Sequence, residues 1–248
     1  MAKDTPYHHL LPLAAKALAE GGHMVSPARV KWNAAGRCLA PVTVVREGRP
    51  FRHKSGGKIL VIDMETPCRR CQACLRSRAR LWSTRGEQEI AGSTRTWFGT
   101  LTLGPQVQMA NAMRARLRHP DFNMASDERR FGYLVQAAGP LVTKWLKRVR
   151  KESGARMRYM LVAERHKSGM PHFHIIVHEA SIATPIRKDV LRRQWYHGFS
   201  RWKLATKGAA RYLCKYLAKE AASRVRASCR YGSAEWYRAV SSQVALTA

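Results

Sequence analysis

Acidic residues are scarce in this chain of 248 residues. It has 16 Asp and Glu against 45 Lys and Arg, which gives a formal net charge of +29. A surface with such an excess attracts polyanions, and counterion release from nucleic acid is the usual source of the affinity. The charge therefore predicts a nucleic-acid partner, although it does not distinguish DNA from RNA.

Long apolar runs are missing as well. A membrane-spanning helix needs about 18 consecutive apolar residues, and the chain has no such run, so we expect no membrane partner. The short apolar run at 10–19 contains Pro12 and Lys16 and follows Asp4, which makes it a poor secretory signal. We therefore expect a cytoplasmic protein. The glycine and lysine residues at 54–58 lack the spacing of a P-loop, so no ATP site is indicated.

An apolar run at 171–177 carries His172 and His174. Residues two apart in a strand project from the same face of a sheet. A second strand is predicted at 158–164, and the simplest hairpin register places Glu164 opposite His172. One carboxylate and two imidazoles suit Mg²⁺ or Mn²⁺ with open positions, but also Zn²⁺ or Fe²⁺. The alternative is a pair of surface histidines on an edge strand.

A helix is predicted at 210–220, since this stretch is rich in Ala, Leu and Lys and has no Gly or Pro. Tyr212 and Tyr216 are four apart and share a face, with Lys215 and Lys219 alongside. A tyrosine with a pKa near 10 is a poor nucleophile, but a metal that polarises a phosphate and a nearby ammonium make its attack feasible. The alternative is that both tyrosines pack in a core or interface.

Together, PHFHIIV and the later YLCKYLAK resemble motifs of the HUH endonucleases. The likeness is to the two-tyrosine rolling-circle replication initiators of microviruses, which are phages with small single-stranded circular DNA. Residues 98–103 resemble the first strand motif of that family, Glu164 its carboxylate, and residues 67–74 a cysteine-rich segment. The resemblance implies an RRM-like antiparallel sheet with helices packed on one face.

The same resemblance implies a nickase in which Glu164, His172 and His174 hold Mg²⁺ or Mn²⁺. Tyr212 or Tyr216 would attack single-stranded origin DNA, leaving a 5′-phosphotyrosyl link and a 3′-hydroxyl primer, and the second tyrosine would rejoin strands to release circles. Two further residues would offset the charge of the phosphate or phenolate, namely Lys215 and Lys219. The implied location is the host cytoplasm, and the implied protein partners are a host helicase and polymerase.

Three cysteines form a CxxCxxC motif, Cys68, Cys71 and Cys74, and Cys38 lies upstream in a turn-like segment. Four thiolates can close a tetrahedral zinc site, so we expect structural zinc here. Uncoordinated thiols and an iron–sulfur cluster are alternatives. A disulfide is disfavoured because the sequence shows no export signal.

The predicted organisation has three parts and an α+β fold. Residues 1–93 form an N-terminal region with the cysteine-rich knuckle and a basic helix, 94–220 the catalytic domain, and 221–248 a basic tail. Further elements are expected in the catalytic domain: a strand at 96–103 and helices at 109–117, 141–149 and 184–196.

Aromatic and basic residues alternate at 195–202. Exposed rings would stack on unpaired bases, and the alternative is that the rings are buried. We expect Arg201, Trp202 and Arg211 to contact nucleic acid. Two competing functions remain: a non-catalytic zinc-containing protein that binds single-stranded nucleic acid, and a one-tyrosine relative such as a relaxase or transposase.

Overall fold

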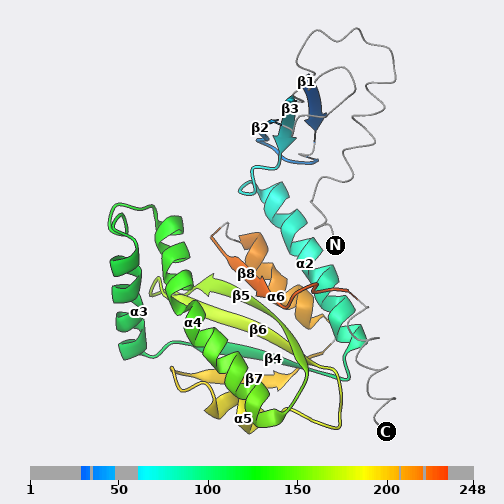
Figure 1. Ribbon diagram of the computed structural model, residues 1–248, viewed down its shortest axis with the longest axis vertical. Coiled ribbons are helices and arrows are strands. Elements are labelled where there is room, and N and C mark those ends of the chain that lie inside the picture. The colour runs from blue at the N-terminus through cyan, green and yellow to red at the C-terminus, as the bar shows by residue number, and fades with distance from the viewer. Residues whose placement is uncertain (1–28, 34–35, 48–60, 207, 220–221, 234–248) are drawn as a thin grey trace, which may run out of the picture. The chain divides into compact units, whose positions relative to one another are not determined.

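The computed structural model describes residues 29–33, 36–47, 61–206, 208–219 and 222–233 (Figure 1). It divides into two compact units, Met1–Cys74 and Leu75–Ala248. The predicted apolar run at 10–19 lies outside the described residues.

The first unit contains a three-stranded sheet made of β1 (Arg29–Asn33), β2 (Val42–Glu47) and β3 (Val61–Thr66). The central strand is β3, which pairs parallel with β1 and antiparallel with β2.

The second unit combines a five-stranded sheet with helices. Helix α2 (Gln72–Gly92) starts within the first unit, and its residues 75–92 belong to the second. The other elements follow in the order β4 (Arg95–Thr102), α3 (Pro105–Arg118), α4 (Asp127–Ser153), β5 (Met157–Arg165), β6 (Pro171–Glu179), α5 (Lys188–Arg193), β7 (Ser200–Leu204), α6 (Ala209–Lys219) and β8 (Arg224–Ala227).

The strands of this sheet lie in the order β7-β4-β6-β5-β8, and all neighbouring strands are antiparallel. The predicted hairpin is confirmed as β5 and β6, in the register that places Glu164 opposite His172. Side chains of β6 alternate between the two faces of the sheet. Phe173 and Ile175 point to one apolar layer, whereas Ile176 shares the other face with the histidines.

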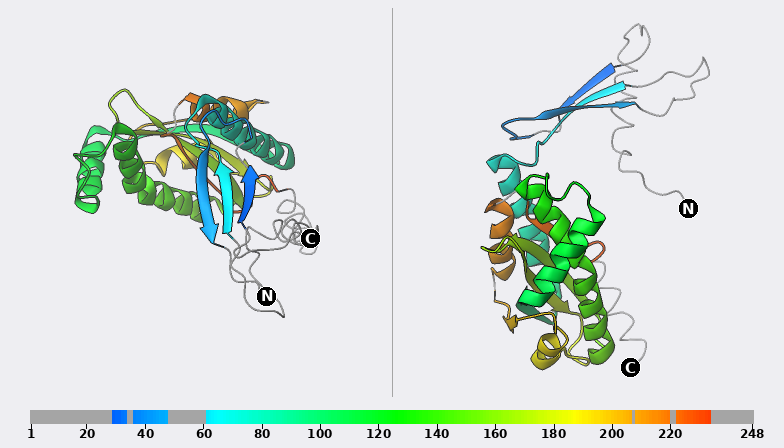
Figure 2. Two further views of the ribbon diagram at one scale, coloured as in Figure 1. Left: turned by 90° about the horizontal axis from the view of Figure 1, so that it is seen from above. Right: turned by 90° about the vertical axis from the view of Figure 1, so that its left-hand side faces the viewer.

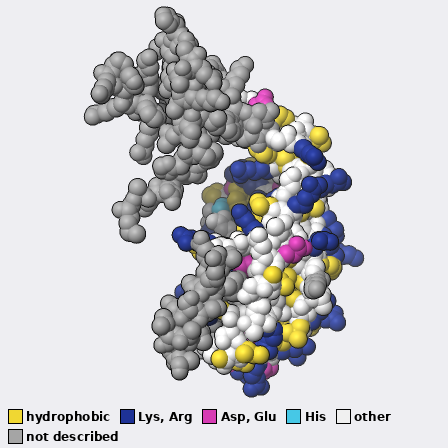
Figure 3. Space-filling model, turned by 90° about the vertical axis from the view of Figure 1, so that its right-hand side faces the viewer, with side chains coloured by type: hydrophobic (Ala, Val, Ile, Leu, Met, Phe, Trp, Pro, Cys, Tyr) yellow, Lys and Arg dark blue, Asp and Glu magenta, His cyan; other side chains and the backbone are white. Residues whose placement is uncertain are grey.

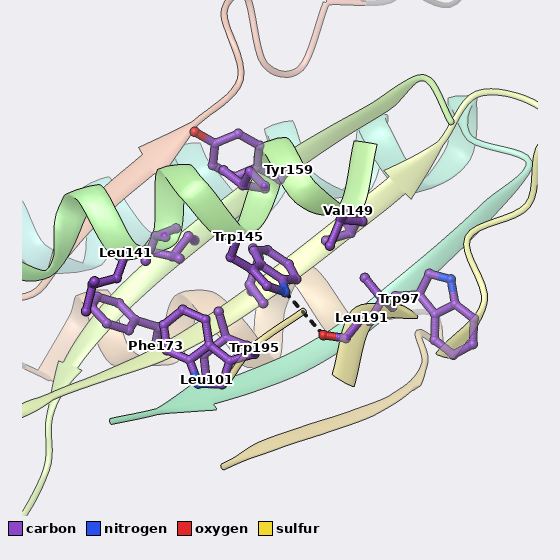
Figure 4. Packing of buried hydrophobic residues seen from close by; sticks show 14 of the residues in the cluster. Trp97, Leu101, Leu141, Trp145, Val149, Tyr159, Phe173, Leu191 and Trp195 are labelled. Atoms are coloured by element: carbon purple, nitrogen blue, oxygen red, sulfur yellow. Dashed lines mark hydrogen bonds between the residues drawn. The ribbon is translucent and has the colours of Figure 1, made fainter. Parts of the chain in front are cut away.

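Helix α4 covers the first face of the sheet. The fully buried ring of Trp145 packs there with Leu101 and Phe173 from the strands (Figure 4). Its indole nitrogen also donates a hydrogen bond to the carbonyl of Leu191, 3.2 Å away. This layer joins α4 and α5 to the centre of the sheet, and it leaves the opposite face to the histidines.

Helices α2 and α6 cover part of the opposite face (Figure 2). Met160 and Ile176 of the sheet pack there with Leu213 of α6. Gly86 of α2 permits the contact with α6, since a Cβ at this position would lie only 2.6 Å from the Cβ of Ala210. The α+β fold with an antiparallel sheet is confirmed. Helices pack on both faces rather than only one, because both sides of β5 and β6 carry apolar residues.

Several boundaries differ from the sequence prediction. Helix α4 begins at Asp127, after the N-cap Ser126, and not at 141. Pro140 lies inside it, and the adjoining carbonyl of Gly139 accepts hydrogen bonds from Thr143 and Arg226. Apolar contacts on both sides of the proline keep the helix continuous. Helix α5 is shorter than the predicted 184–196, since it covers only Lys188–Arg193.

Two segments outside the predicted catalytic domain, 94–220, also adjoin its sheet. Helix α2, from the predicted N-terminal region, packs against the sheet. Residues 224–227, from the predicted tail, form the edge strand β8 beside β5. Residues 234–248 of the predicted tail lie outside the described residues.

Candidate active site

Three potential metal ligands meet on the sheet face that carries α6. Glu164 of β5 lies directly opposite His172 of β6, and its Oε2 is 2.9 Å from Nε2 of His174. The centroids of the two imidazole rings are 4.9 Å apart. The structure thus brings the three residues together as the strand register predicts.

Two threonines of β4 orient the histidines from the neighbouring strand. The hydroxyl of Thr102 is hydrogen-bonded to Nδ1 of His172 at 3.0 Å, and that of Thr100 to Nδ1 of His174 at 3.4 Å. A partner at Nδ1 fixes the ring and leaves Nε2 facing the site, as is usual for metal-binding histidines. Sequence reasoning missed both threonines, although their TxT spacing matches that of the histidines.

Burial sets the protonation of this cluster. Burial lowers the pKa of His172 to about 4, and the neighbouring His174 makes a smaller contribution. Burial also lowers the pKa of His174 to about 4. Burial also raises the pKa of Glu164. Both imidazoles are therefore neutral near pH 7, which is the form that binds metals, and the contact between Glu164 and His174 is a hydrogen bond rather than an ion pair.

The donor set fits a hard divalent cation. Two neighbouring ligands of an octahedral ion with bonds of about 2.1 Å lie about 3.0 Å apart. The 2.9 Å between Glu164 and His174 matches that separation. A carboxylate with neutral imidazoles suits Mn²⁺ and also accepts Mg²⁺. Glu164 and His174 could therefore share such an ion, but among the described residues only the four cysteines form a set of three or more ligands whose atoms all lie within 4.8 Å of one another.

Both tyrosines of α6 adjoin this cluster. The ring of Tyr216 stacks on the imidazole of His174, with centroids 4.2 Å apart and planes inclined by 1°. Its hydroxyl donates to the hydroxyl of Tyr212 at 3.3 Å. Tyr216 is only 7% exposed, whereas Tyr212 is 49% exposed. The two phenol oxygens are thus neighbours, and Tyr212 is the more accessible.

The two lysines of α6 lie over the tyrosine rings. Nζ of Lys215 is 3.7 Å from the ring centroid of Tyr212, and Nζ of Lys219 is 5.3 Å from that of Tyr216. The hydrogen bond from Tyr216, together with Lys215, lowers the pKa of Tyr212. Burial raises the pKa of Tyr216. The environment therefore favours the phenolate form at Tyr212 over Tyr216.

Positive charge continues along the edge strand β7. Arg201 lies opposite Thr100, and Lys203 lies opposite Phe98, so both project from the face of the sheet that holds the histidines. Both are exposed. Figure 3 shows the wider imbalance on one side of the molecule, where Lys and Arg side chains are spread over the described part and acidic ones are few.

The other residues predicted to contact nucleic acid have different surroundings. Trp202 is 3% exposed and stacks on Trp145, with centroids 5.5 Å apart. Its ring belongs to the core, so it cannot stack on a base as predicted. Alternation in β7 turns Trp202 away from the face that carries Arg201. Arg211 is exposed on α6 and forms an ion pair with Glu87 at 3.5 Å.

The four cysteines of the first unit converge. Their sulfur atoms all lie within 4.8 Å of one another, with Cys38 and Cys71 3.9 Å apart and Cys68 and Cys74 4.0 Å apart. Tetrahedral zinc with bonds of about 2.3 Å places its sulfur ligands about 3.8 Å apart. The cluster can therefore hold a metal such as zinc.

Backbone amides support the thiolate form within the cysteine cluster. The amide of Leu39, followed by that of Cys74, lowers the pKa of Cys71 to about 6, and the amide of Arg70 lowers that of Cys68. Burial acts in the opposite direction at Cys74 and raises its pKa to about 12. Thiolates are the metal-binding form, so a cation would be needed to ionise Cys74 near pH 7.

Fold and site together define an α+β protein whose antiparallel sheet presents a carboxylate and two histidines to a helix bearing two tyrosines. Residues 96–221 match the family model of the replication-associated protein ORF2. This match covers 126 of the 248 residues, just over half, so the chain belongs to that family. No curated protein and no solved structure matches the chain.

Membership supports a role in the initiation of replication and is compatible with a nuclease-like enzyme. The microvirus type and the two-tyrosine type remain predictions. Among the described residues, none of the helices has the length and apolar character needed to cross a bilayer.

Proposed function

We propose that this protein starts replication by nicking single-stranded DNA at an origin and later rejoins the strands. One observation carries the proposal: the ring of Tyr216 stacks on His174, and its hydroxyl touches that of Tyr212. Both potential nucleophiles thus lie beside the same potential metal ligands. Membership in a replication-associated family supports this assignment.

Each residue of the site has a proposed role. A divalent cation, Mg²⁺ or Mn²⁺, held by Glu164, His172 and His174 would polarise the scissile phosphate. The phenol oxygen of Tyr212 forms a bond to phosphorus while the bond from phosphorus to O3′ breaks. The phenolic proton passes to solvent, and the departing O3′ takes up a proton. The products are a 5′-phosphotyrosyl link and a 3′-hydroxyl that a polymerase can extend.

Accessibility favours Tyr212 as the first nucleophile. It is 49% exposed and has the closer lysine, since Lys215 lies 3.7 Å from its ring. Tyr216 is buried against His174 and would attack once the origin is remade: its phenol oxygen forms a bond to phosphorus as the new bond from phosphorus to O3′ breaks. The freed 3′-hydroxyl then attacks the phosphotyrosyl bond of Tyr212, which releases Tyr212 and closes the circle. Lys219 lies near the ring of Tyr216 and would offset negative charge there.

Charge supports a nucleic-acid substrate. The chain carries a net +29, and Arg201 and Lys203 line the edge of the face that holds the site. Arginine and lysine bind the phosphate backbone without reading its sequence. Arg211 would contact phosphate at the outer side of α6. A host helicase and host polymerase are the proposed protein partners.

The direct test is an adduct assay. Labelled single-stranded DNA from the protein's own replicon is incubated with the protein and Mn²⁺ or Mg²⁺ and then denatured. The proposal expects a denaturation-resistant protein–DNA adduct that EDTA abolishes and that His172→Ala greatly reduces. His166→Ala is the matched control, because His166 is exposed in the turn before β6. An adduct that forms equally in EDTA would contradict metal-assisted attack.

A second function is favoured by the cysteine cluster alone. A non-catalytic protein with structural zinc that binds single-stranded nucleic acid would account for the sulfur geometry and the charge. It would retard the DNA in a salt-dependent way and leave it uncleaved at every candidate origin. A one-tyrosine relative would instead form adducts through only one of the two phenols.

We also propose that Cys38, Cys68, Cys71 and Cys74 hold structural zinc. Elemental analysis should find one zinc per chain, and Cys71→Ser should lower that content and the thermal stability of the protein. Cys229→Ser is the matched control, since Cys229 is exposed and lies outside the cluster. Full zinc content in Cys71→Ser would exclude this assignment.

A further inference from the structure

A cavity opens beside Tyr212 and Phe98. It lies between β4, the end of β7 and the start of α6, and its volume is about 260 Å³. The side chains that line it include those of Phe98, Lys203, Ala205, Thr206, Ala209 and Tyr212. Glu164, His172 and His174 do not line this cavity, and the proposed chemistry assigns no ligand to it.

The lining suits a flat, polar-edged aromatic group. The rings of Phe98 and Tyr212 meet edge to face, with centroids 5.6 Å apart. Nζ of Lys203 lies 5.7 Å from the ring centroid of Phe98, where it can donate to a ligand on that ring. Ala205 and Ala209 have small side chains that leave space open. None of the described residues that line the cavity is acidic. The cavity should therefore bind a ring that carries hydrogen-bond acceptors more favourably than it binds a cation.

A nucleobase combines these properties. Aromatic side chains hold unpaired bases by stacking, and a neighbouring cation strengthens that contact. The ring carbonyls and nitrogens of a base accept hydrogen bonds of the kind that Lys203 and the hydroxyl of Thr206 can donate. A cavity of about 260 Å³ has room for one base.

In-line attack indicates which nucleotide would enter. The phenol oxygen approaches phosphorus opposite O3′, so the nucleotide that ends in the new 3′-hydroxyl leaves on the far side of the phosphate. The nucleotide that keeps the phosphate on its 5′-oxygen stays attached to the tyrosine. We call it the retained nucleotide, and its base is the one that can reach a cavity lined by Tyr212.

We propose that this cavity binds the base of the retained nucleotide and so helps to select the position of the nick. This inference rests on the proposed function, because it takes its substrate from that reaction. It adds a specificity pocket made by Phe98, Lys203 and the turn before α6, which the chemistry of nicking does not itself require. The stacked base would also hold the cut strand in place until rejoining.

The first experiment uses the unchanged protein and altered DNA. An oligonucleotide with an abasic site at the retained nucleotide is compared with one that is abasic at the nucleotide on the other side of the nick. Adduct formation at subsaturating DNA should fall about tenfold for the first, as expected for the loss of one stacked base, and less for the second. An equal loss of adduct with both abasic oligonucleotides, or no loss with either, would contradict the proposed base pocket.

The second experiment separates binding from cleavage. The fluorescent base 2-aminopurine at the retained nucleotide should be quenched on binding in EDTA, where no cleavage is expected. Ala205→Phe fills the cavity and should remove this quenching, and Lys203→Ala should weaken it. Leu204→Phe is the matched control, because Leu204 is exposed, does not line the cavity and should leave quenching unchanged. Circular dichroism confirms that each variant is folded.

The outcomes distinguish the two proposals. If intact DNA forms no adduct, the proposed function fails, and this inference fails with it. If intact DNA forms the adduct, yet base removal and Ala205→Phe change neither yield nor quenching, the proposed function stands and the base pocket alone is wrong.

Discussion

The ring of Tyr216 lies flat against the imidazole of His174, with centroids 4.2 Å apart and planes inclined by 1°. The stack ties α6 to β6 at the point where the proposed chemistry takes place. A tyrosine so placed is held rigidly, and its hydroxyl is hydrogen-bonded to that of Tyr212. Both phenol oxygens therefore lie beside the same potential metal ligands.

Replacing the tyrosines tests this relationship. Tyr212→Phe should slow the formation of the first adduct more than Tyr216→Phe does, because Tyr212 is the more exposed and lies closer to Lys215. The double variant should form no adduct above background. Single-turnover assays with labelled DNA, followed by peptide mapping of the adduct, measure both effects. Cleavage by the double variant at the normal rate would show that neither phenol is the nucleophile.

The threonine beside His172 provides a second prediction. Thr102→Val removes the hydroxyl that is hydrogen-bonded to Nδ1 of His172, so the ring loses its orientation. Loss of such a partner weakens metal binding by about 10–100-fold. The Mn²⁺ concentration that gives half-maximal adduct formation should rise by that factor.

Thr94→Val serves as the control for this change, because the hydroxyl of Thr94 is exposed and bonds only a backbone carbonyl at the other end of β4. An unchanged Mn²⁺ requirement in Thr102→Val would mean that His172 does not bind the metal, or that its ring needs no such partner.

A third prediction concerns pH. Burial, helped by Arg158, lowers the pKa of His178 from 6.5 to about 3, and the ring is hydrogen-bonded to Thr96 and Tyr231. Between these values the unfolded chain binds a proton that the folded protein does not, so stability should fall as the pH drops from 6.5 toward 3. One such group contributes a slope of about 1.4 kcal/mol per pH unit.

His178→Gln should reduce that slope by about this amount between pH 4 and 6, as measured by urea unfolding at several pH values. His172 and His174 contribute in the same direction, so part of the slope should remain. An equal slope in His178→Gln would show that His178 is protonated in the folded protein.

A fourth prediction compares two helical glycines. Gly86→Ala would place a Cβ 2.6 Å from that of Ala210, so α2 and α6 must move apart. Such overpacking costs about 1–3 kcal/mol of unfolding free energy. Gly139→Ala is the matched case in α4, where nothing lies within 4 Å of the new Cβ. It should stabilise the protein by about 0.5–1 kcal/mol. Equal effects in thermal and urea unfolding would contradict the close contact of α2 with α6.

The hairpin and the tyrosine helix could be predicted from the sequence because their signals are local. Alternation in 158–164 and 171–177 determines which side chains share a face, and a short turn fixes the register. The four-residue spacing of Tyr212 and Tyr216 similarly places both on one side of a helix. These patterns were enough to bring Glu164, His172 and His174 together.

Other features of the fold and the site depend on contacts between segments that are distant in the sequence, and these could not be predicted. Thr100 and Thr102 become partners of the histidines only because β4 pairs with β6, which lies some 70 residues further along the chain. The burial of Trp202 depends on the pairing of β7 with β4, which the five residues of β7 do not predict by themselves. A proline at 140 predicts a helix boundary, yet α4 continues past it because the residues on both sides pack in the core.

The pairing of β8 with β5 bears on how a minimal working fragment should be cut. The strand that carries Glu164 has β6 on one side and residues 224–227 on the other. A fragment limited to 94–220 would expose the backbone of β5 along that edge and would lack α2, which packs against α6. A fragment of residues 75–233 keeps both β8 and residues 75–92 of α2, so we expect it to be soluble and well packed.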